Sequence, residues 1–489
     1  MLKHGIIILL NIGLENIMLS KNSLKEQNQY QVVALEDLVP KNHLVRDISN
    51  AIDFNFIYDE VKDLYNQEIG RPSIDPVVLF KMILIQYMFG IRSMRQTVKE
   101  IEVNLAYRWF LGFDFFDNVP HFSTFGKNYE RRFKDTDIFE KIFMRILDEA
   151  INCGFVDSSS VFIDSTCIKA SANKKKRYKE IVENESKKYI NSLDKEIKED
   201  RNNHNKKPLK DKDDDDDQNK TITKSTTDPE SGILRKGEHE KIFAYSAHTA
   251  CDKHNFVLSA CVTPANVHDS MVFDEIYDKV NTKFPNTQNF VLDAAYKTPW
   301  ICKRIIDDNK IPFLPYKRPM TKKGFYKKYE YVYDKYYDHY VCPNGEILKY
   351  TTTNRLGYKE YKSNSKTCEN CQQREQCTNN KKFNKLVTRH VWSEYLEIAE
   401  EIRHTELWKD IYPQRSKTVE RLFGDAKEKH GMRYTQLRGL KKVKIQVYLT
   451  FTCMNLKKLA KWKKIKELSY SFLQNFSVLF TNSPILLYA

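Results

Sequence analysis

Two predicted β-strands each deliver an aspartate where the chain is expected to leave a sheet. The first strand ends in Val-Phe-Ile-Asp164, and the second ends in Phe-Val-Leu-Asp293. Carboxylates at strand ends of an open sheet line a shared crevice, so neighbouring strands would place Asp164 beside Asp293. Two close carboxylates repel unless a divalent cation with oxygen ligands neutralises them. Taken singly, such an aspartate is also a common turn former.

A third carboxylate lies on the helix predicted over residues 416–429. Glu420 and Lys427 are seven residues apart, which is nearly two helical turns, so they share one face. Gly424 between them would let a backbone approach closely, and Lys427 with Arg415 would hold phosphates. A solvated helix face is the alternative. A separate apolar stripe is expected to pack on the sheet: Val419, Leu422, Phe423 and Ala426.

Three carboxylates with flanking cations suit two-metal phosphoryl transfer. One ion activates water or a sugar 3′-hydroxyl and the other stabilises the leaving oxygen, with the ions about 3.5–4 Å apart. This chemistry needs no side-chain nucleophile, and the sequence offers no persuasive Ser/His/Asp or Cys/His arrangement. His268 and Asp269 follow a predicted strand, and we interpret them as a satisfied histidine and a helix-capping aspartate.

A mixed α/β sheet is expected to position these acids. Strands are predicted at residues 161–170, 243–252, 256–265, 289–296 and 311–317, with helices at 270–284 and 298–309. This order predicts a mixed sheet with helices on its faces. Further helices are predicted at 394–404 and 440–464, the last one basic on one side.

A charged insertion separates the first two strands. Its front half carries apolar residues at helical spacing, which predicts one charged helix or a helical hairpin: Tyr178, Val182, Tyr189, Leu193 and Ile197. Its back half, from Asn202 through the five aspartates at 213–217, is expected to be a disordered, exposed loop.

The region from 35 to 157 is predicted to be all-helical. The motif at 70–76 precedes an apolar helix, Gly90 and Gly112 act as stops, and the apolar run 77–91 is too short and too interrupted to span a membrane. Basic residues along these helices either face DNA or form a solvated side: Arg92, Arg95, Lys99, Arg108, Lys127, Arg131 and Arg132.

The ten cysteines are too scattered for a disulfide framework, which indicates a reducing cytosol. Four of them lie in a Tyr-rich stretch, where one CxxC pair has two more cysteines nearby: Cys342, Cys368, Cys371 and Cys377. Such a group either closes a tetrahedral zinc site or consists of plain reduced thiols. The other six are expected to be small core residues.

Length and charge bound the class of protein. A chain of 489 residues is too long for one ordinary core, and its net charge of +15 can hold a polyanion. Residues 5–14 resemble the apolar core of a secretory signal but lack a small-residue cleavage site. We favour Met18 as the true start over a targeting signal.

The motif order IDST, NVHDS, VLDAAY and R-x4-VE-x6-K resembles the DDE transposases of bacterial insertion sequences. GRPSIDP, GIRSMRQ, HFSTFGK and STTDPESGILRKGEHEKIFAYSAHTACD are most similar to the family numbered 1182 among insertion sequences. The resemblance implies a ribonuclease-H-like catalytic domain with Asp164, Asp293 and Glu420 as the metal-binding triad. It also implies that Tyr412, Arg415 and Lys427 contact the transferred DNA end. Four residues separate Arg415 from Glu420, where the broader signature often has three.

The resemblance adds weight to zinc at the four cysteines, because this family often carries cysteines here. It further implies a cytoplasmic, nucleoid-associated enzyme that uses two Mg²⁺ (or Mn²⁺) ions. Its partners would be double-stranded DNA, both terminal inverted repeats and target, and a second copy of the chain when ends are paired. The alternatives are a nuclease without joining activity and a non-catalytic, transposase-derived DNA-binding protein.

The predicted division of the chain follows from these elements. It comprises an upstream extension (1–17), a helical DNA-binding domain (18–157), a ribonuclease-H-like catalytic domain (158–317 and 389–465), a charged insertion (174–240), a Tyr/Cys-rich insertion (318–388) and a C-terminal tail (466–489).

Overall fold

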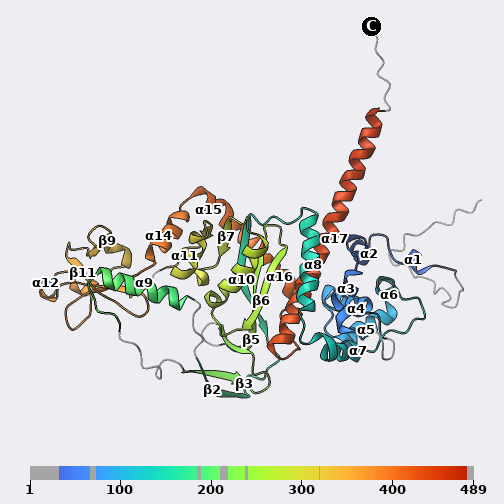
Figure 1. Ribbon diagram of the computed structural model, residues 1–489, viewed down its shortest axis with the longest axis horizontal. Helices are drawn as coiled ribbons and strands as arrows, with labels where there is room; N and C mark the ends of the chain where they lie inside the picture. Colours follow the sequence, from blue (N-terminus) through green and yellow to red (C-terminus); the bar gives the residue numbers. More distant parts are fainter. Residues whose placement is uncertain are drawn as a thin grey trace, which may run out of the picture.

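The computed structural model describes residues 32–66, 73–183, 189–209, 219–236, 240–318 and 320–481. In these ranges the chain forms an N-terminal group of helices, a six-stranded mixed sheet, a five-stranded antiparallel sheet and a two-stranded ribbon (Figure 1). The predictions for residues 1–17 and for the five aspartates at 213–217 lie outside the described residues.

The N-terminal region is helical, as predicted. Its helices are α1 (Leu35–Leu38), α2 (Leu44–Ala51), α3 (Phe56–Val61), α4 (Pro76–Met88), α5 (Met94–Val103), α6 (Leu105–Leu111), α7 (Ser123–Asn128) and α8 (Ile138–Asn152). Asp75 accepts a hydrogen bond from the Val77 N–H and caps α4, with Pro76 in its first turn. Gly112 adopts φ +77° and ends α6, because a residue without Cβ enters the left-handed region freely.

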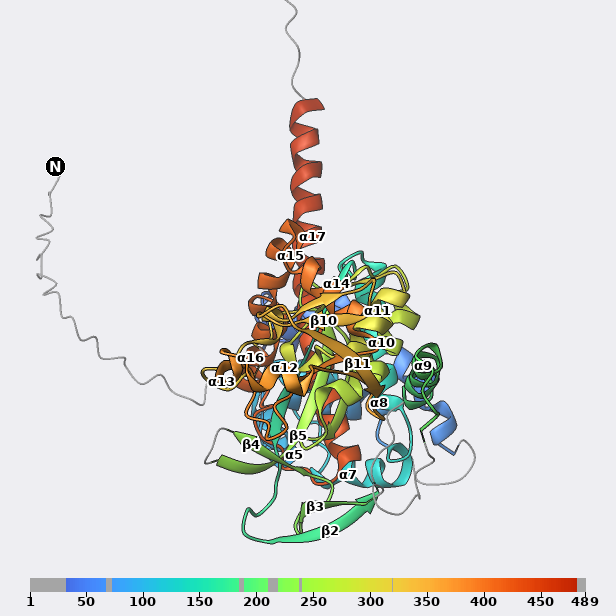
Figure 2. The same cartoon turned by 90° about the vertical axis from the view of Figure 1, so that its left-hand side faces the viewer.

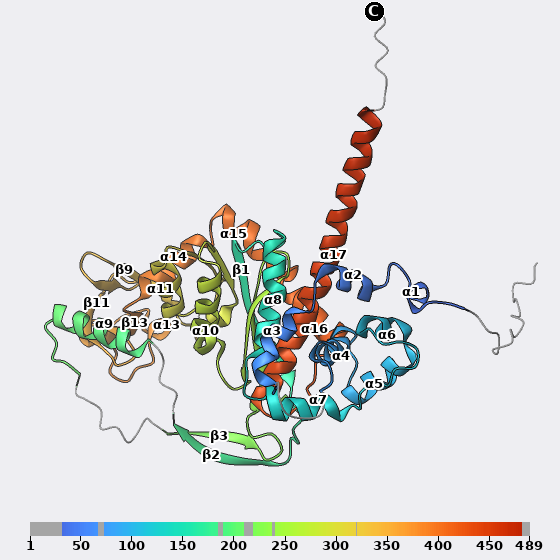
Figure 3. The same ribbon diagram turned by 45° about the vertical axis from the view of Figure 1, so that its right-hand side comes forward.

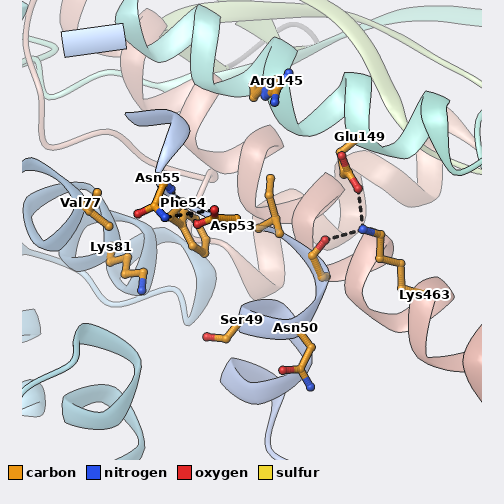
Figure 4. Close-up of a pocket in the computed structure, with 12 residues that line it drawn as sticks. Ser49, Asn50, Asp53, Phe54, Asn55, Val77, Lys81, Arg145, Glu149 and Lys463 are labelled. Carbon is orange, nitrogen blue, oxygen red and sulfur yellow. Dashed lines mark hydrogen bonds and ion pairs between the residues drawn. The ribbon is translucent and has the colours of Figure 1, made fainter. Parts of the chain in front are cut away.

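The long helix α17 (Leu440–Thr481) ties this region to the rest of the molecule. The Lys463 ammonium on α17 donates to the Ala51 carbonyl at the end of α2 (2.7 Å) and to Glu149 on α8 (2.5 Å), beside a pocket between these helices (Figure 4). We predicted a helix ending near residue 464, whereas α17 continues to Thr481 and so takes in most of the predicted tail.

The six-stranded sheet comprises β1 (Ser160–Lys169), β4 (Gly232–Lys236), β5 (Glu240–Cys251), β6 (Val257–Pro264), β7 (Asn289–Leu292) and β8 (Ile311–Phe313). β1 pairs antiparallel with β5 and parallel with β7, β7 pairs parallel with β8, and both β4 and β6 pair antiparallel with β5. The five predicted strands are present, although β7 and β8 end four residues before their predicted ends. β4 is an addition, because we assigned its residues to the charged insertion.

Helices cover both faces of this sheet. α10 (Asp269–Lys283) and α11 (Pro299–Asp307) lie on one side of β1, and α8, α16 (Val419–Lys429) and α17 lie on the other (Figure 3). The Tyr277 ring on α10 packs 4.8 Å from Phe290 of β7, and the Tyr448 hydroxyl on α17 donates to the Ala260 carbonyl of β6 (2.9 Å). A sheet buried on both faces reads as continuous apolar runs, which is the pattern that revealed its strands.

In the described residues the front half of the charged insertion contains one helix, which agrees with the first of the two predicted alternatives, but this helix begins later than the apolar spacing indicated. Residues 177–183 form strand β2 (Arg177–Glu183), which pairs with β3 (Asn219–Ser225) as a ribbon below the six-stranded sheet (Figure 2). The one helix there is α9 (Ile190–Asn203), with Leu193 and Ile197 buried. Tyr178 and Val182 therefore lie on a strand, and their four-residue spacing does not mark a helical face.

The Tyr-rich stretch forms the five-stranded sheet, ordered β13 (Leu386–His390), β12 (Tyr358–Lys362), β11 (Ile347–Thr353), β10 (His339–Val341) and β9 (Val332–Asp334). A small core of five residues lies against it: Tyr331, Tyr340, Leu348, Tyr361 and Val387. Short helices α12 (Ser365–Glu369) and α13 (Arg374–Cys377) follow β12, and α14 (Ser393–Ile402) and α15 (Glu406–Ile411) lead back to the larger sheet. None of the helices in the described ranges is long and apolar enough to cross a membrane.

Candidate active site

Asp164 and Asp293 lie side by side, as the sequence predicted. In the parallel pair of β1 and β7, Ile163 stands opposite Leu292, so the two aspartates occupy the next position on adjacent strands. Asp293 directly follows β7 and caps the turn of residues 294–296 by accepting from the Ala294 N–H (2.5 Å).

One detail of the prediction is wrong, because β1 does not leave the sheet at Asp164. The strand continues to Lys169, and Asp164 pairs with Thr249 of β5. β7 is the shorter strand, so the edge of β1 that faces it becomes unpaired at Asp164. The carboxylate is therefore held by a continuous strand and opens toward the space beyond the end of β7.

The Arg415 guanidinium forms an ion pair with the Asp164 carboxylate. Its Nη2 donates to Asp164 Oδ2 at 2.6 Å, and the exposed fractions of the two side chains are 8% and 16%. Burial raises the pKa of Asp164 to about 6, against the opposing charge of Arg415 and a hydrogen bond from the Ser165 N–H. The Arg415 Nη1 atom is buried without a hydrogen-bond partner among the described residues.

Tyr412 lies within the electrostatic reach of all three acids. Its ring stacks on Trp408 at 4.6 Å, and the Trp408 indole N–H donates to the Leu314 carbonyl (3.0 Å). Burial is the main cause that raises the pKa of Tyr412, Arg415 opposes it, and the carboxylates Asp293, Asp164 and Glu420 add to the rise. In this structure Tyr412 and Arg415 belong to the interior of the site, whereas the resemblance implied contacts with DNA.

Glu420 is in the first turn of α16, where its side chain is exposed. The predicted apolar stripe is confirmed, because Val419, Leu422, Phe423 and Ala426 are the buried residues of α16. A Cβ on Gly424 would meet no atom within 4 Å, and Lys427 is half-buried farther along. Among the described residues, no three acidic, histidine or cysteine side chains are arranged to hold a metal ion, so Glu420 does not close the set here.

The predicted role of Asp269 as the residue that caps the helix is wrong. The His268 ring accepts from the Ser270 N–H and caps α10, while Asp269 Oδ1 lies 3.5 Å from Nδ1 of the buried His248. The charge of Asp269 also raises the pKa of Asp164. Polar residues inside β5 were the overlooked signal, since His248 and Thr249 stand between two alanines of this strand, beside Asp164.

Two family models match the chain. A transposase domain model (DUF772) matches residues 33–131, and a transposase DDE domain model matches residues 341–460. No curated protein and no solved structure matches it.

The two matched domains indicate a DDE transposase. The first match covers α1 to α7 of the helical region, and the second includes Glu420 and Lys427 but not the strands that carry Asp164 and Asp293. Members of this class are DNA-cleaving, metal-dependent enzymes, so DNA is the partner of this transposase.

The four cysteines of the Tyr-rich stretch lie within the second match and line one pocket of the five-stranded sheet. Their sulfur atoms have separate hydrogen-bond partners. Cys342 Sγ accepts from the Glu346 N–H (3.3 Å), Cys368 contacts Ser363 Oγ (3.1 Å), and Cys377 contacts the Tyr331 hydroxyl (3.2 Å). The four cysteines line the same pocket, but among the described residues their sulfur atoms are not arranged as a metal-binding site.

The basic residues of the helical region divide into two groups. Arg108 is 5% exposed and donates to the carbonyls of Asp114 and Asp117, so it is structural and cannot face DNA. Arg92, Lys127 and Arg131 are exposed, in keeping with a DNA-facing surface or a solvated side.

Proposed function

We propose that this transposase cuts DNA at the ends of an insertion sequence and joins those ends to target DNA. Asp164, Asp293 and Glu420 would hold two Mg²⁺ or Mn²⁺ ions. The observation that carries the proposal is the parallel pairing of β1 with β7, which puts two carboxylates at one position with α16 packed against the same strand.

The carboxylates fit divalent metal ions by their chemistry. Asp164 is desolvated, has one charged partner and lies beside a second carboxylate, which is an arrangement that a hard cation relieves. When bound, the ions would activate the attacking oxygen and stabilise the leaving one. The catalytic state therefore requires Arg415 to release Asp164 and α16 to bring Glu420 toward the aspartates.

The chain's own residues orient the DNA in this proposal. Arg415, once released, would bind the phosphate next to the cut, where its planar fork can make two hydrogen bonds. Tyr412, on its Trp408 support, would limit how far the DNA end enters. Lys427 would hold the flanking backbone as a point charge.

A cleavage and joining assay with Asp164→Asn tests the proposal. Duplexes that carry the element's terminal repeats would be incubated with Mg²⁺, and pre-cleaved ends with a free 3′-hydroxyl would be offered a target plasmid. The native enzyme should cut and join, whereas Asp164→Asn should do neither but still bind DNA. Asp194→Asn is the matched control, because Asp194 is exposed on α9.

The same assay separates the rival functions. Shorter fragments without joined products would identify a nuclease. Unchanged biological activity of Asp164→Asn would identify a DNA-binding protein in which the acids are relics.

The mixed sheet supports a ribonuclease-H-like fold for the catalytic part, with β1 between β5 and β7 and helices on both faces. Similarity to the family numbered 1182 stays a prediction. Pairing two element ends would require two copies of the chain, and the mass of the complex on paired-end DNA tests this dimer.

We further propose a structural zinc ion at Cys342, Cys368, Cys371 and Cys377. Support comes from their common pocket and from the small core of their sheet, since a metal can supply folding free energy that a small core lacks. Purified protein should contain one zinc per chain, and Cys371→Ser should lose it. Cys302→Ser, at a buried cysteine of α11, should retain it. A zinc-free native protein would contradict the proposal.

A further inference from the structure

A large groove runs between the N-terminal helices and the junction of α16 with α17. One wall comes from α4, α5 and α7, and the other from residues 427–449. Its volume is about 1170 Å³. This exceeds the roughly 300–1,000 Å³ of sites for single small molecules, so the groove has room for a segment of a polymer.

Contacts with backbone carbonyls hold the two walls of the groove together. A Cβ on Gly90 would lie 2.8 Å from the Lys429 carbonyl oxygen, which shows how closely the chain after α4 approaches the end of α16. His430 Nδ1 contacts the Tyr87 carbonyl at 2.8 Å, and the Lys457 ammonium donates to the Met88 carbonyl at 2.5 Å. The groove is therefore formed before any ligand binds.

The charge of the groove suits a polyanion. Its lining includes one anion, Glu130, and six cations: Arg92, Lys127, Arg131, Lys427, Arg433 and Lys442. Arg433 pairs with Glu428, and Lys442 pairs with Glu130 at 3.0 Å. The other four cations have no ion pair with any residue that the structure describes. Unpaired cations of this kind are available to phosphates.

Aromatic side chains also line this groove, and binding of a DNA duplex would not require them. They are Tyr87, Phe122, Phe125, Tyr129 and Tyr434. Tyr434 is 56% exposed, an unusual position for a large ring. In a duplex the faces of the bases are covered by their neighbours, whereas unpaired bases stack on aromatic rings. Cations combined with aromatic faces are the pattern of single-strand recognition.

Two polar atoms in the groove have no partner among the described residues. They are the hydroxyl of Tyr129, a residue only 7% exposed, and Oε1 of Gln86. Buried polar groups are normally hydrogen-bonded, because leaving one unpaired costs about 1–3 kcal/mol. The hydrogen-bonding edge of a nucleobase would satisfy both types of atom.

Strand β1 connects the groove to the candidate active site. The Lys169 N–H donates to the Arg433 carbonyl (3.2 Å), and the Thr435 N–H donates to the Lys169 carbonyl (2.9 Å), so Tyr434 pairs in parallel beside the last residue of β1. Asp164 is five residues upstream on the same strand, roughly 17 Å away at strand rise. Lys427 belongs to the helix that carries Glu420.

We propose that this groove binds a short unpaired DNA segment adjoining the end that is cut, with its bases on Tyr434 and its phosphates on Arg92, Lys127, Arg131 and Lys427. The proposal rests on the function proposed above and adds that the strands next to the cut are separated on the enzyme.

The test compares two DNA probes without divalent metal, so that no chemistry intervenes. One is a blunt duplex of the terminal repeat, and the other is the same duplex with a few unpaired thymines at the cut end. The native protein should bind the second probe about tenfold more tightly, as expected for one or two stacked bases. Tyr434→Ala should remove most of this gain and leave the affinity for the blunt duplex unchanged.

Two further variants keep the test independent of folding. Tyr129→Phe removes only a hydroxyl that has no hydrogen-bond partner in the part of the chain that the structure describes, so this variant should fold normally and still lose part of the gain. Tyr336→Ala removes an 87%-exposed ring from the five-stranded sheet and should change neither affinity.

The outcomes separate this inference from the function on which it rests. Equal affinity of the native protein for both probes, or equal losses for both probes in Tyr434→Ala, would overturn the unpaired-strand proposal and leave the transposase proposal intact. Failure to bind either probe would contradict the proposed function itself.

Discussion

The two sheets of this transposase shift the pKa of a carboxylate in opposite directions. In the six-stranded sheet, burial raises the pKa of Asp164 to about 6, although Arg415 and one backbone N–H oppose the rise. In the five-stranded sheet, burial also acts on Asp338, but hydrogen bonds from Tyr361, Tyr333 and His204 outweigh it and lower the pKa of Asp338. Asp164 therefore has few hydrogen-bond donors around its carboxylate, whereas Asp338 has several.

The surroundings of the two groups explain the difference. Asp164 follows a fully buried apolar run, Val161, Phe162 and Ile163, in a core large enough to carry an unfavourable charge. The smaller sheet has a five-residue core rich in tyrosine, so it depends on polar bonds such as Tyr333 Oη to Asp338 (2.7 Å). An under-supplied carboxylate indicates a place for a ligand, and a satisfied one indicates a structural role.

The largest expected effect distinguishes the two carboxylate sites by activity. Asp293→Asn should lower the rate of DNA cleavage by more than about a hundredfold, the upper end for groups that merely orient metal ligands. Asp338→Asn should leave that rate within a few-fold. Initial rates on terminal-repeat DNA at saturating Mg²⁺ give both values. A comparable loss in the two variants would remove the functional difference between the sheets.

Core truncation should show that the larger sheet carries most of the stability. Ile163 is fully buried in β1, so Ile163→Ala should lower the free energy of unfolding by about 2–5 kcal/mol. Urea denaturation followed by tryptophan fluorescence measures the change. A loss below about 1 kcal/mol would mean that β1 is not at the centre of the core.

The pH dependence of stability should expose the strained carboxylate. Because the folded pKa of Asp164 lies at about 6 and its ordinary value is 3.8, the folded state holds the proton more tightly. Its contribution to stability is therefore full below about pH 4 and is lost as the pH rises through about 6, a change of about 3 kcal/mol.

Asp164→Asn removes this contribution. In metal-free buffer the variant should gain stability relative to the native protein as the pH rises from about 4 to about 6, measured by denaturation at each pH. A difference that stays constant across this range would show that Asp164 is not strained.

The smallest effect concerns the five-stranded sheet. Asp338→Ala leaves the hydroxyls of Tyr333 and Tyr361 without their acceptor, which should cost about 1–3 kcal/mol. Amide hydrogen exchange should quicken in β9 to β13 and stay unchanged in β1 and β7. Exchange that quickens equally in both sheets would show that they unfold as one unit.

The sequence was informative where a side-chain pattern follows directly from local geometry. The strands with Asp164 and Asp293, the helices of the N-terminal region and the apolar face of α16 were all predicted from periodicity. The ribbon of β2 and β3 was missed, because its apolar residues are few and its partner strand lies beyond a long polar stretch. β4 was missed because only Ile233 and Leu234 of its five residues are apolar, although its partner β5 follows closely in the chain.

The site shows the same division. Residue types and order alone pointed to a carboxylate triad and to metal-dependent DNA chemistry, since those depend on which groups the chain contains. Tertiary structure alone decided that Arg415 covers Asp164 and that Asp269 faces His248. Such pairings join residues that are distant along the chain or point across a sheet, and their geometry exists only after the core has packed.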